Sequence, residues 1–134
     1  MELGAEANRD RDGNFLAPYQ LARSLCFAGA AAAQVQPIDT VYIDFRNDAG
    51  LRRECDEARR DGFTGKMAIH PAQVAVINEV FTPTMEALSK ARAIVAAFAA
   101  SPDSGAIAID GVMYDRPHLA RAKQVLARAG AETK

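Results

Sequence analysis

The sequence lacks an excess of charge of either sign, a cysteine framework and a long apolar run. Its 134 residues include 16 Lys+Arg against 17 Asp+Glu, which gives a formal net charge of −1. A chain this close to neutral gives no electrostatic reason to expect a nucleic acid or a membrane surface as its partner. The longest apolar stretch, residues 25–33, is mostly alanine and far too short to span a membrane.

Cysteine is scarce as well. The only two are Cys26 and Cys55, and they form no Cys-x-x-Cys motif. This excludes a disulfide framework and gives no indication of a structural zinc site, so the usage is typical of a reducing compartment. The acidic start Met1-Glu2 does not have the pattern of a signal peptide, and we therefore expect a cytoplasmic protein. We expect both cysteines on helices, with Cys26 filling a core.

What is present suits a globular α/β protein. Hydrophobic residues make up 49% of the chain and charged residues 25%, enough apolar surface for a core. Apolar periodicity and turn residues predict an order of elements. Helices are expected over residues 18–36, 51–60, 72–81, 82–100 and 117–129, strands over 38–45 and 66–69, and a hairpin over 107–114.

Capping and turn residues define three of these boundaries more closely. Thr82 is predicted as the N-cap of the helix ending near residue 100, with Pro83 at its first position. Gly62 is predicted to end the helix over residues 51–60. The pair Asp110-Gly111 is typical of a hairpin turn.

A strand, a helix and another strand within about thirty residues form one βαβ unit. Two strands alone make a poor sheet, and a parallel pair is normally buried on both faces. The sequence therefore predicts a fragment of a larger α/β fold.

Two segments carry a more specific signal. One fits the pattern Gly-Phe-x-Gly-Lys-x-x-Ile-His-Pro-x-Gln, and the other joins the predicted hairpin to the last helix. They read Gly62-Phe63-Thr64-Gly65-Lys66-Met67-Ala68-Ile69-His70-Pro71-Ala72-Gln73 and Asp110-Gly111-Val112-Met113-Tyr114-Asp115-Arg116-Pro117-His118. With these motifs the chain resembles the HpcH/HpaI aldolase/citrate lyase family, more narrowly the citrate lyase beta-subunit-like CoA-ester lyases, over almost its whole length.

The resemblance implies a fold. Members of the family are (β/α)8 TIM barrels with a C-terminal extension and are often trimers or hexamers. A full barrel needs about 200 residues or more. We therefore expect residues 1–100 to supply the C-terminal part of the barrel, about its last two strands with their helices. Residues 101–134 are expected to form the C-terminal extension, a hairpin followed by a helix.

The resemblance also implies an activity. It is Mg²⁺-dependent cleavage or formation of a hydroxyacyl-CoA ester, of the malyl- or citramalyl-CoA type, through an acetyl-CoA enolate. The partners are a CoA thioester and a small hydroxy or keto acid. The family binds the metal through a Glu and an Asp and grips the substrate with an Arg. Gly4-Ala5-Glu6 invites alignment with the metal motif, but Ala7 then stands where the Asp belongs. The metal ligands are therefore expected upstream of Met1, and the chain alone is expected to be inactive.

Two alternatives to the lyase stay open. One is a non-catalytic truncated remnant or assembly module, whose apolar strand faces would need a partner. The other is an acyl-CoA thioesterase built on the same scaffold.

The substrate- and CoA-binding candidates follow the two predicted strands. Asp44, at the end of the first, would orient substrate or hold water on magnesium, or it caps the following turn. His70-Pro71 ends the second strand, Gln73 follows in the next predicted helix, and the resemblance places all three on the CoA side of the site. His70 alternatively caps the next helix. Lys66, at the start of the second strand, is expected to form a salt bridge rather than bind phosphate.

Asp115 is the catalytic candidate. In related lyases the Asp of the matching segment reaches into the site of the adjacent subunit and serves as general acid/base for the acetyl-CoA methyl or enolate. Asp115 also stands directly before Arg116-Pro117, the natural place for the N-cap of the last helix. An N-cap and a catalytic role do not exclude each other.

Overall fold

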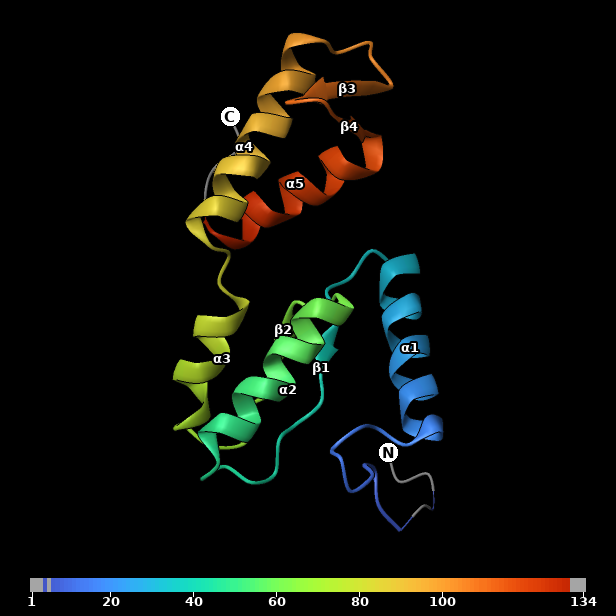
Figure 1. Ribbon diagram of the computed structural model, residues 1–134, viewed down its shortest axis with the longest axis vertical. Helices are drawn as coiled ribbons and strands as arrows, with labels where there is room; N and C mark the ends of the chain where they lie inside the picture. Colours follow the sequence, from blue (N-terminus) through green and yellow to red (C-terminus); the bar gives the residue numbers. More distant parts are fainter. Residues whose placement is uncertain (1–3, 5, 131–134) are drawn as a thin grey trace. The chain divides into compact units, whose positions relative to one another are not determined.

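The computed structural model describes residue 4 and residues 6–130. It has two compact units, Met1–Phe81 and Thr82–Lys134 (Figure 1), called here the N-terminal and the C-terminal unit. The boundary at residue 81 differs from the expected one at residue 100, because the helix after it packs with the C-terminal elements. The assignment of residues 1–100 to a barrel and 101–134 to an extension stays a prediction.

The N-terminal unit alternates helices with two very short strands. The order is α1 (Ala17–Ala32), β1 (Ile38–Asp39), α2 (Asp48–Asp61), β2 (Gly65–Lys66) and α3 (Gln73–Phe81). β1 and β2 are parallel, with Ile38 opposite Gly65 and Asp39 opposite Lys66. The expected βαβ unit is therefore present.

Both strands end well before the expected residues 45 and 69. The last ladder bond runs from the Met67 amide to the Asp39 carbonyl, 3.1 Å away. Beyond it the Tyr42 carbonyl accepts a hydrogen bond from the Gln73 side chain, at 2.8 Å, instead of from a neighbouring strand. Residues 40–47 and 67–72 therefore form loops rather than strand, and the expectation of long strands was wrong.

The core of the N-terminal unit lies between α2 and α3, which run side by side in Figure 1. Leu51 and Cys55 of α2 meet Ile77 and Val80 of α3, and Cys55 is fully buried. Burial raises the pKa of the Cys55 thiol, because a thiolate loses hydration there. Cys26 on α1 is exposed, so the expectation that it fills a core was wrong.

Local sequence sets both ends of α2. The Asn47 side chain accepts a hydrogen bond from the Gly50 amide, at 2.9 Å, and caps the N-terminus. Gly62 ends the helix at φ 104°, as expected, and its amide returns to the Ala58 carbonyl. A Cβ at residue 62 would also lie 2.7 Å from the Phe27 ring, so only glycine fits.

α1 has no buried residue among those that the structure describes. Phe27 on this helix meets Phe63 with ring centroids 5.9 Å apart, and Arg23 reaches Asp39. Leu21 and Leu25, four residues apart and so on one face of α1, are 61% and 63% exposed. None of the described residues covers this face. Among all the residues that the structure describes, no helix is long and apolar enough to cross a membrane.

The C-terminal unit is a helix pair with a hairpin between its members: α4 (Met85–Ala100), β3 (Ala106–Ile109), β4 (Val112–Asp115) and α5 (Arg116–Arg128). Asp110 and Gly111 form the turn with φ values of 50° and 78°, which confirms the predicted hairpin. α4 begins after Thr84, whose hydroxyl accepts from the Ala87 amide at 3.2 Å; the prediction of Thr82 as its N-cap was wrong.

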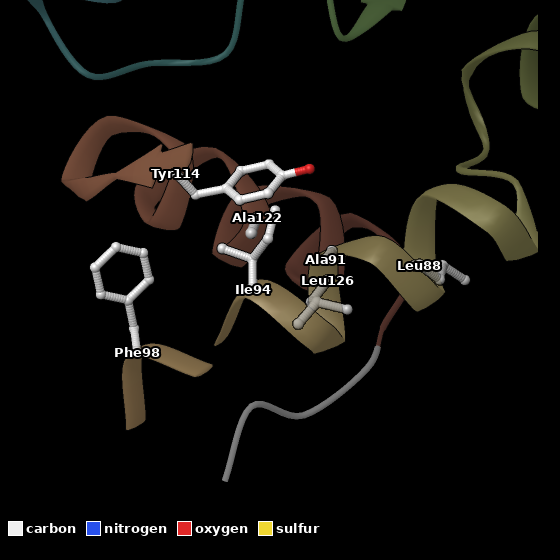
Figure 2. Close-up of a cluster of buried hydrophobic side chains, with 7 residues drawn as sticks. All are labelled: Leu88, Ala91, Ile94, Phe98, Tyr114, Ala122 and Leu126. Atoms are coloured by element: carbon white, nitrogen blue, oxygen red, sulfur yellow. The ribbon is translucent and has the colours of Figure 1, made fainter. Parts of the chain in front are cut away.

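Figure 2 shows the core of this unit. α4 and α5 pack face to face, and one aromatic ring of β4 covers the end near the hairpin. The buried side chains are Leu88, Ala91, Ile94 and Phe98 of α4, Tyr114 of β4, and Ala122 and Leu126 of α5. Tyr114 immediately precedes the catalytic candidate Asp115, so this core fixes the backbone from which that carboxylate projects.

Candidate functional site

The structure confirms the salt bridge that was expected for Lys66. Its side chain is fully buried, and Nζ lies 3.0 Å from Asp39 Oδ2 and 2.9 Å from Glu54 Oε2. Arg23 and Arg9 extend the network by binding Asp39 at 3.1 Å and Glu54 at 2.9 Å. Every group of the Lys66 triad is therefore paired, as buried charges must be, and its role in this unit is structural.

Gln73 is likewise a structural residue in the N-terminal unit. It is fully buried, and its Oε1 accepts from the Ile69 amide at 2.9 Å. Its Nε2 donates to the Tyr42 carbonyl at 2.8 Å. One side chain thus joins the loop after β1 to the loop after β2. These two bonds leave one N–H and one oxygen lone pair of the Gln73 amide for a further partner.

His70 lies where those two loops meet. Its ring stacks on Phe45, with centroids 4.4 Å apart and 22° between the planes. Nδ1 accepts from the Ala72 amide at 3.2 Å, so the proton of the neutral ring is on Nε2. The His70 side chain therefore bonds within the turn just before α3, which begins at Gln73. The exposed ring still leaves Nε2–H available as a donor to a ligand.

Phe45 was missed by the sequence argument, which treated residues 38–45 as strand. It lies between His70 and Arg46, whose guanidinium carbon is 5.1 Å from the Phe45 centroid. A planar, partly exposed stack with a cation at one side suits a flat or anionic ligand. The signal that could have found it is the aromatic-basic pair at the start of the turn before α2.

Asp44 and Pro71 have simpler surroundings. Asp44 is exposed in the loop, not at a strand end, and its carbonyl accepts from the Asn47 amide at 3.0 Å. Asn47 rather than Asp44 caps α2, and the interpretation of Asp44 as a cap of the turn stays a prediction. Pro71 is exposed, and its carbonyl accepts from the Val74 amide at 3.1 Å, in the turn that opens α3.

Asp115 ends β4 and is the N-cap of α5, as predicted. Its Oδ1 accepts from the His118 amide at 3.4 Å and lies 2.5 Å from Nδ1 of the His118 ring. The side-chain hydrogen bond from His118 lowers the pKa of Asp115 below the ordinary carboxyl value. The carboxylate is half exposed and is ionised at neutral pH, which suits a base.

His118 carried no role in the sequence argument. The spacing Asp-x-x-His at the start of a helix is the signal that could have found it, since residues three apart face each other across a capping box. Its ring also meets the buried Tyr114 edge-on, with centroids 5.5 Å apart.

A magnesium site needs several oxygen ligands at one point. Among the described residues, no three His, Cys, Asp or Glu side chains could hold one ion. The described residues therefore offer no site built from three such side chains. Of Gly4-Ala5-Glu6, the stretch that invited alignment with the metal motif, Ala5 lies outside the described residues.

A family model for carbon–carbon bond lyases of the TIM-barrel fold matches residues 19–131. The chain belongs to this family. Citramalyl-CoA lyase of Rattus norvegicus is 40% identical over 129 residues, which are 95% of this chain and 37% of that protein. A (3S)-malyl-CoA thioesterase of Cereibacter sphaeroides is 37% identical over 97% of this chain and 45% of its own length.

Solved structures agree. Protein CitE of Mycobacterium tuberculosis, in complex with magnesium, acetoacetate and coenzyme A, superimposes with a TM-score of 0.76 at 34% identity. The match covers 96% of this lyase-family chain and 47% of CitE. The chain therefore spans less than half the length of these relatives.

Proposed function

We propose that the chain supplies the C-terminal part of a CoA-ester lyase, with Asp115 as its general acid/base. The reaction is cleavage or formation of a hydroxyacyl-CoA of the malyl- or citramalyl-CoA type. The likeness of 96% of the chain to CitE, solved with magnesium, acetoacetate and coenzyme A, carries the proposal. The relative named citramalyl-CoA lyase supports the substrate class.

The chemistry assigns a proton transfer to Asp115. In the condensing direction its carboxylate takes a proton from the acetyl-CoA methyl group, the resulting enolate attacks the carbonyl carbon of the keto acid, and the carbonyl oxygen becomes a hydroxyl by taking a proton from water. In cleavage the hydroxyl gives its proton to water and becomes the keto C=O as the carbon–carbon bond breaks. The electron pair of that bond passes to the acetyl carbon as an enolate, and the protonated carboxyl of Asp115 returns a proton there. An Asp carboxyl is ionised at neutral pH, and the lowered pKa of Asp115 leaves it in this base form.

The N-terminal unit is proposed to contact CoA. His70 offers its Nε2–H and a stacked face beside Phe45, with Arg46 on the same stack. Pro71 and Asp44 lie in the same two loops, while Gln73 holds the loops together. Magnesium, which is bound in the CitE complex, is proposed to bind through residues of the part of the lyase that this chain does not span.

A hybrid enzyme tests this function. The matched segment of rat citramalyl-CoA lyase is replaced by this 134-residue chain, and the products formed from citramalyl-CoA are quantified. The proposal expects acetyl-CoA and pyruvate in equal amounts. In the hybrid, Asp115→Asn is expected to lower kcat about 100-fold or more, since general acid/base groups contribute about 10²–10⁴. Asp103→Asn, in an exposed loop of the same unit, is the matched control.

Thioester hydrolysis is the second candidate, favoured by the 37% identity to a malyl-CoA thioesterase. Hydrolysis releases the free thiol of CoA and an intact hydroxy acid, whereas the lyase leaves the thioester bond unbroken. Free thiol in place of acetyl-CoA would thus replace the lyase proposal with the thioesterase. A folded hybrid that forms neither set of products would contradict both.

The chain by itself is proposed to be inactive. Without a magnesium site among its described residues, the 134-residue chain alone is expected to cleave neither malyl- nor citramalyl-CoA. Turnover that EDTA abolishes would contradict this part of the proposal and leave the assignment of Asp115 standing.

A further inference from the structure

The contact between Asp115 and His118 is unusually close for two exposed side chains. Oδ1 and Nδ1 are 2.5 Å apart, although the side chains are 43% and 51% exposed. Exposed ion pairs contribute little to folding stability, because water screens them. The capping of α5 accounts for the bond from the His118 amide, but the ion pair itself adds little to the stability of the fold.

The position of one proton decides what the pair does. Nδ1 carries either a proton or a lone pair, never both in the ring plane. The Asp115 amide, 3.3 Å from Nδ1, could donate only to a lone pair. The shorter contact to an ionised carboxylate needs a proton on Nδ1, because two lone pairs at 2.5 Å would repel each other. With Asp115 ionised, His118 is therefore the donor and Oδ1 the acceptor.

On the basis of the proposed function, we propose that His118 is a positioning residue. Its Nδ1 proton holds Oδ1 of Asp115, so that Oδ2 is the atom that exchanges a proton with the acetyl carbon. Among the described residues, the contacts of this carboxylate all involve Oδ1. Oδ2 therefore stays available to substrate while the carboxylate plane is fixed.

The ring of His118 is itself held in place by its contact with Tyr114. Tyr114 is 9% exposed, belongs to the α4–α5 core, and meets the ring edge-on at 88°. Of the neighbouring cations, Lys90 on α4 lies over the Tyr114 ring, with Nζ 5.6 Å from its centroid. Arg116 donates to the Pro102 carbonyl and covers Phe98. Among the described residues, His118 is thus the side chain whose ring nitrogen contacts the Asp115 carboxylate directly.

The first test uses the 134-residue chain and no activity. The Asp115 carboxyl is titrated by ¹³C NMR in the parent chain and in two variants. His118→Phe keeps a ring against Tyr114 but removes the donor, whereas His118→Asn places an N–H close to the position of Nδ1. The proposal expects the pKa of Asp115 to rise towards 3.8 in the Phe variant and to stay lowered in the Asn variant. Equal values in all three chains would overturn it.

The second test measures kinetics in the hybrid enzyme. His118→Phe is expected to lower kcat about 10-fold with KM unchanged, and His118→Asn to restore most of the loss. If Asp115→Asn removes activity and His118→Phe has no effect, the positioning role fails and the proposed function stands. If Asp115→Asn has no effect, the proposed function fails, and the positioning role fails with it.

Discussion

Asp115 shows how one residue can serve the fold and the chemistry together. As N-cap of α5 it needs only a side-chain acceptor, which asparagine also provides. We expect Asp115→Asn to leave the free energy of unfolding nearly unchanged and Asp115→Ala to lower it by about 1 kcal/mol. Urea denaturation of the two variants checks this. A loss of stability in the Asn variant as large as in the Ala variant would contradict the capping role.

The same residue sets a pH dependence. The pKa of Asp115 is lowered in the folded chain by the hydrogen bond from His118, so its contribution to stability is present above the ordinary carboxyl pKa. That contribution is lost as the pH falls below about 4 through the lowered folded-state value. We expect the difference in stability between the parent chain and His118→Phe to shrink over this window. A difference that grows on acidification would contradict the assigned direction.

Lys66 is expected to be sensitive to substitution because its charge is buried and paired. Its buried Nζ is shared by Asp39, 2% exposed, and by Glu54. Lys66→Met would leave both carboxylates without their shared cation, and we expect a loss of about 3 kcal/mol of unfolding free energy. Lys123→Met, at an exposed position of α5, is the matched control. Equal effects of the two changes in urea denaturation would contradict a structural role for Lys66.

Among the elements, the helices followed from the sequence more closely than the strands did. Apolar periodicity and Gly62 located α2 well, and Asp110-Gly111 located the hairpin. Strand propensity alone predicted residues 38–45, yet the ladder ends at Asp39. The reason is a tertiary one: the buried Gln73 side chain takes the Tyr42 carbonyl away from any sheet. No local sequence pattern predicts such a hydrogen bond.

The candidate site divides in the same way. Asp115 and His70 were named as candidates because they lie in the two motifs, and Asp44 because it stands near the end of a predicted strand; their roles stay predictions. Phe45 and His118 were missed, because the stack on His70 and the contact to Asp115 depend on how the backbone folds.

Gln73 permits a direct test at the scale of elements. It bridges the loops after β1 and β2 through the Ile69 amide and the Tyr42 carbonyl. Gln73→Leu keeps much of the volume and removes both bonds, and we expect a loss of about 2 kcal/mol or more. The Ile69 amide should also exchange faster with deuterated water. Gln124→Leu, exposed on α5, is the control, and an unchanged exchange rate at Ile69 would contradict the bridge.

At the scale of the whole molecule, two features bear on how the chain works. It spans less than half the length of its relatives, and α1 presents Leu21 and Leu25 to solvent in the described part of the chain. Apolar faces of this kind normally meet another surface. They are consistent with the proposal that this chain is one part of a larger lyase barrel.

The most direct test of that proposal is deuterium exchange into acetyl-CoA by the hybrid enzyme. Acetyl-CoA is incubated in deuterated water with an unreactive keto-acid analogue, and label in the methyl group is measured by mass spectrometry. Because the step needs only a base at the acetyl carbon, it isolates the role of Asp115 from carbon–carbon bond cleavage. The account predicts exchange by the parent hybrid and by Asp103→Asn, and exchange at least about 100-fold slower with Asp115→Asn. Equal exchange by all three enzymes would contradict it.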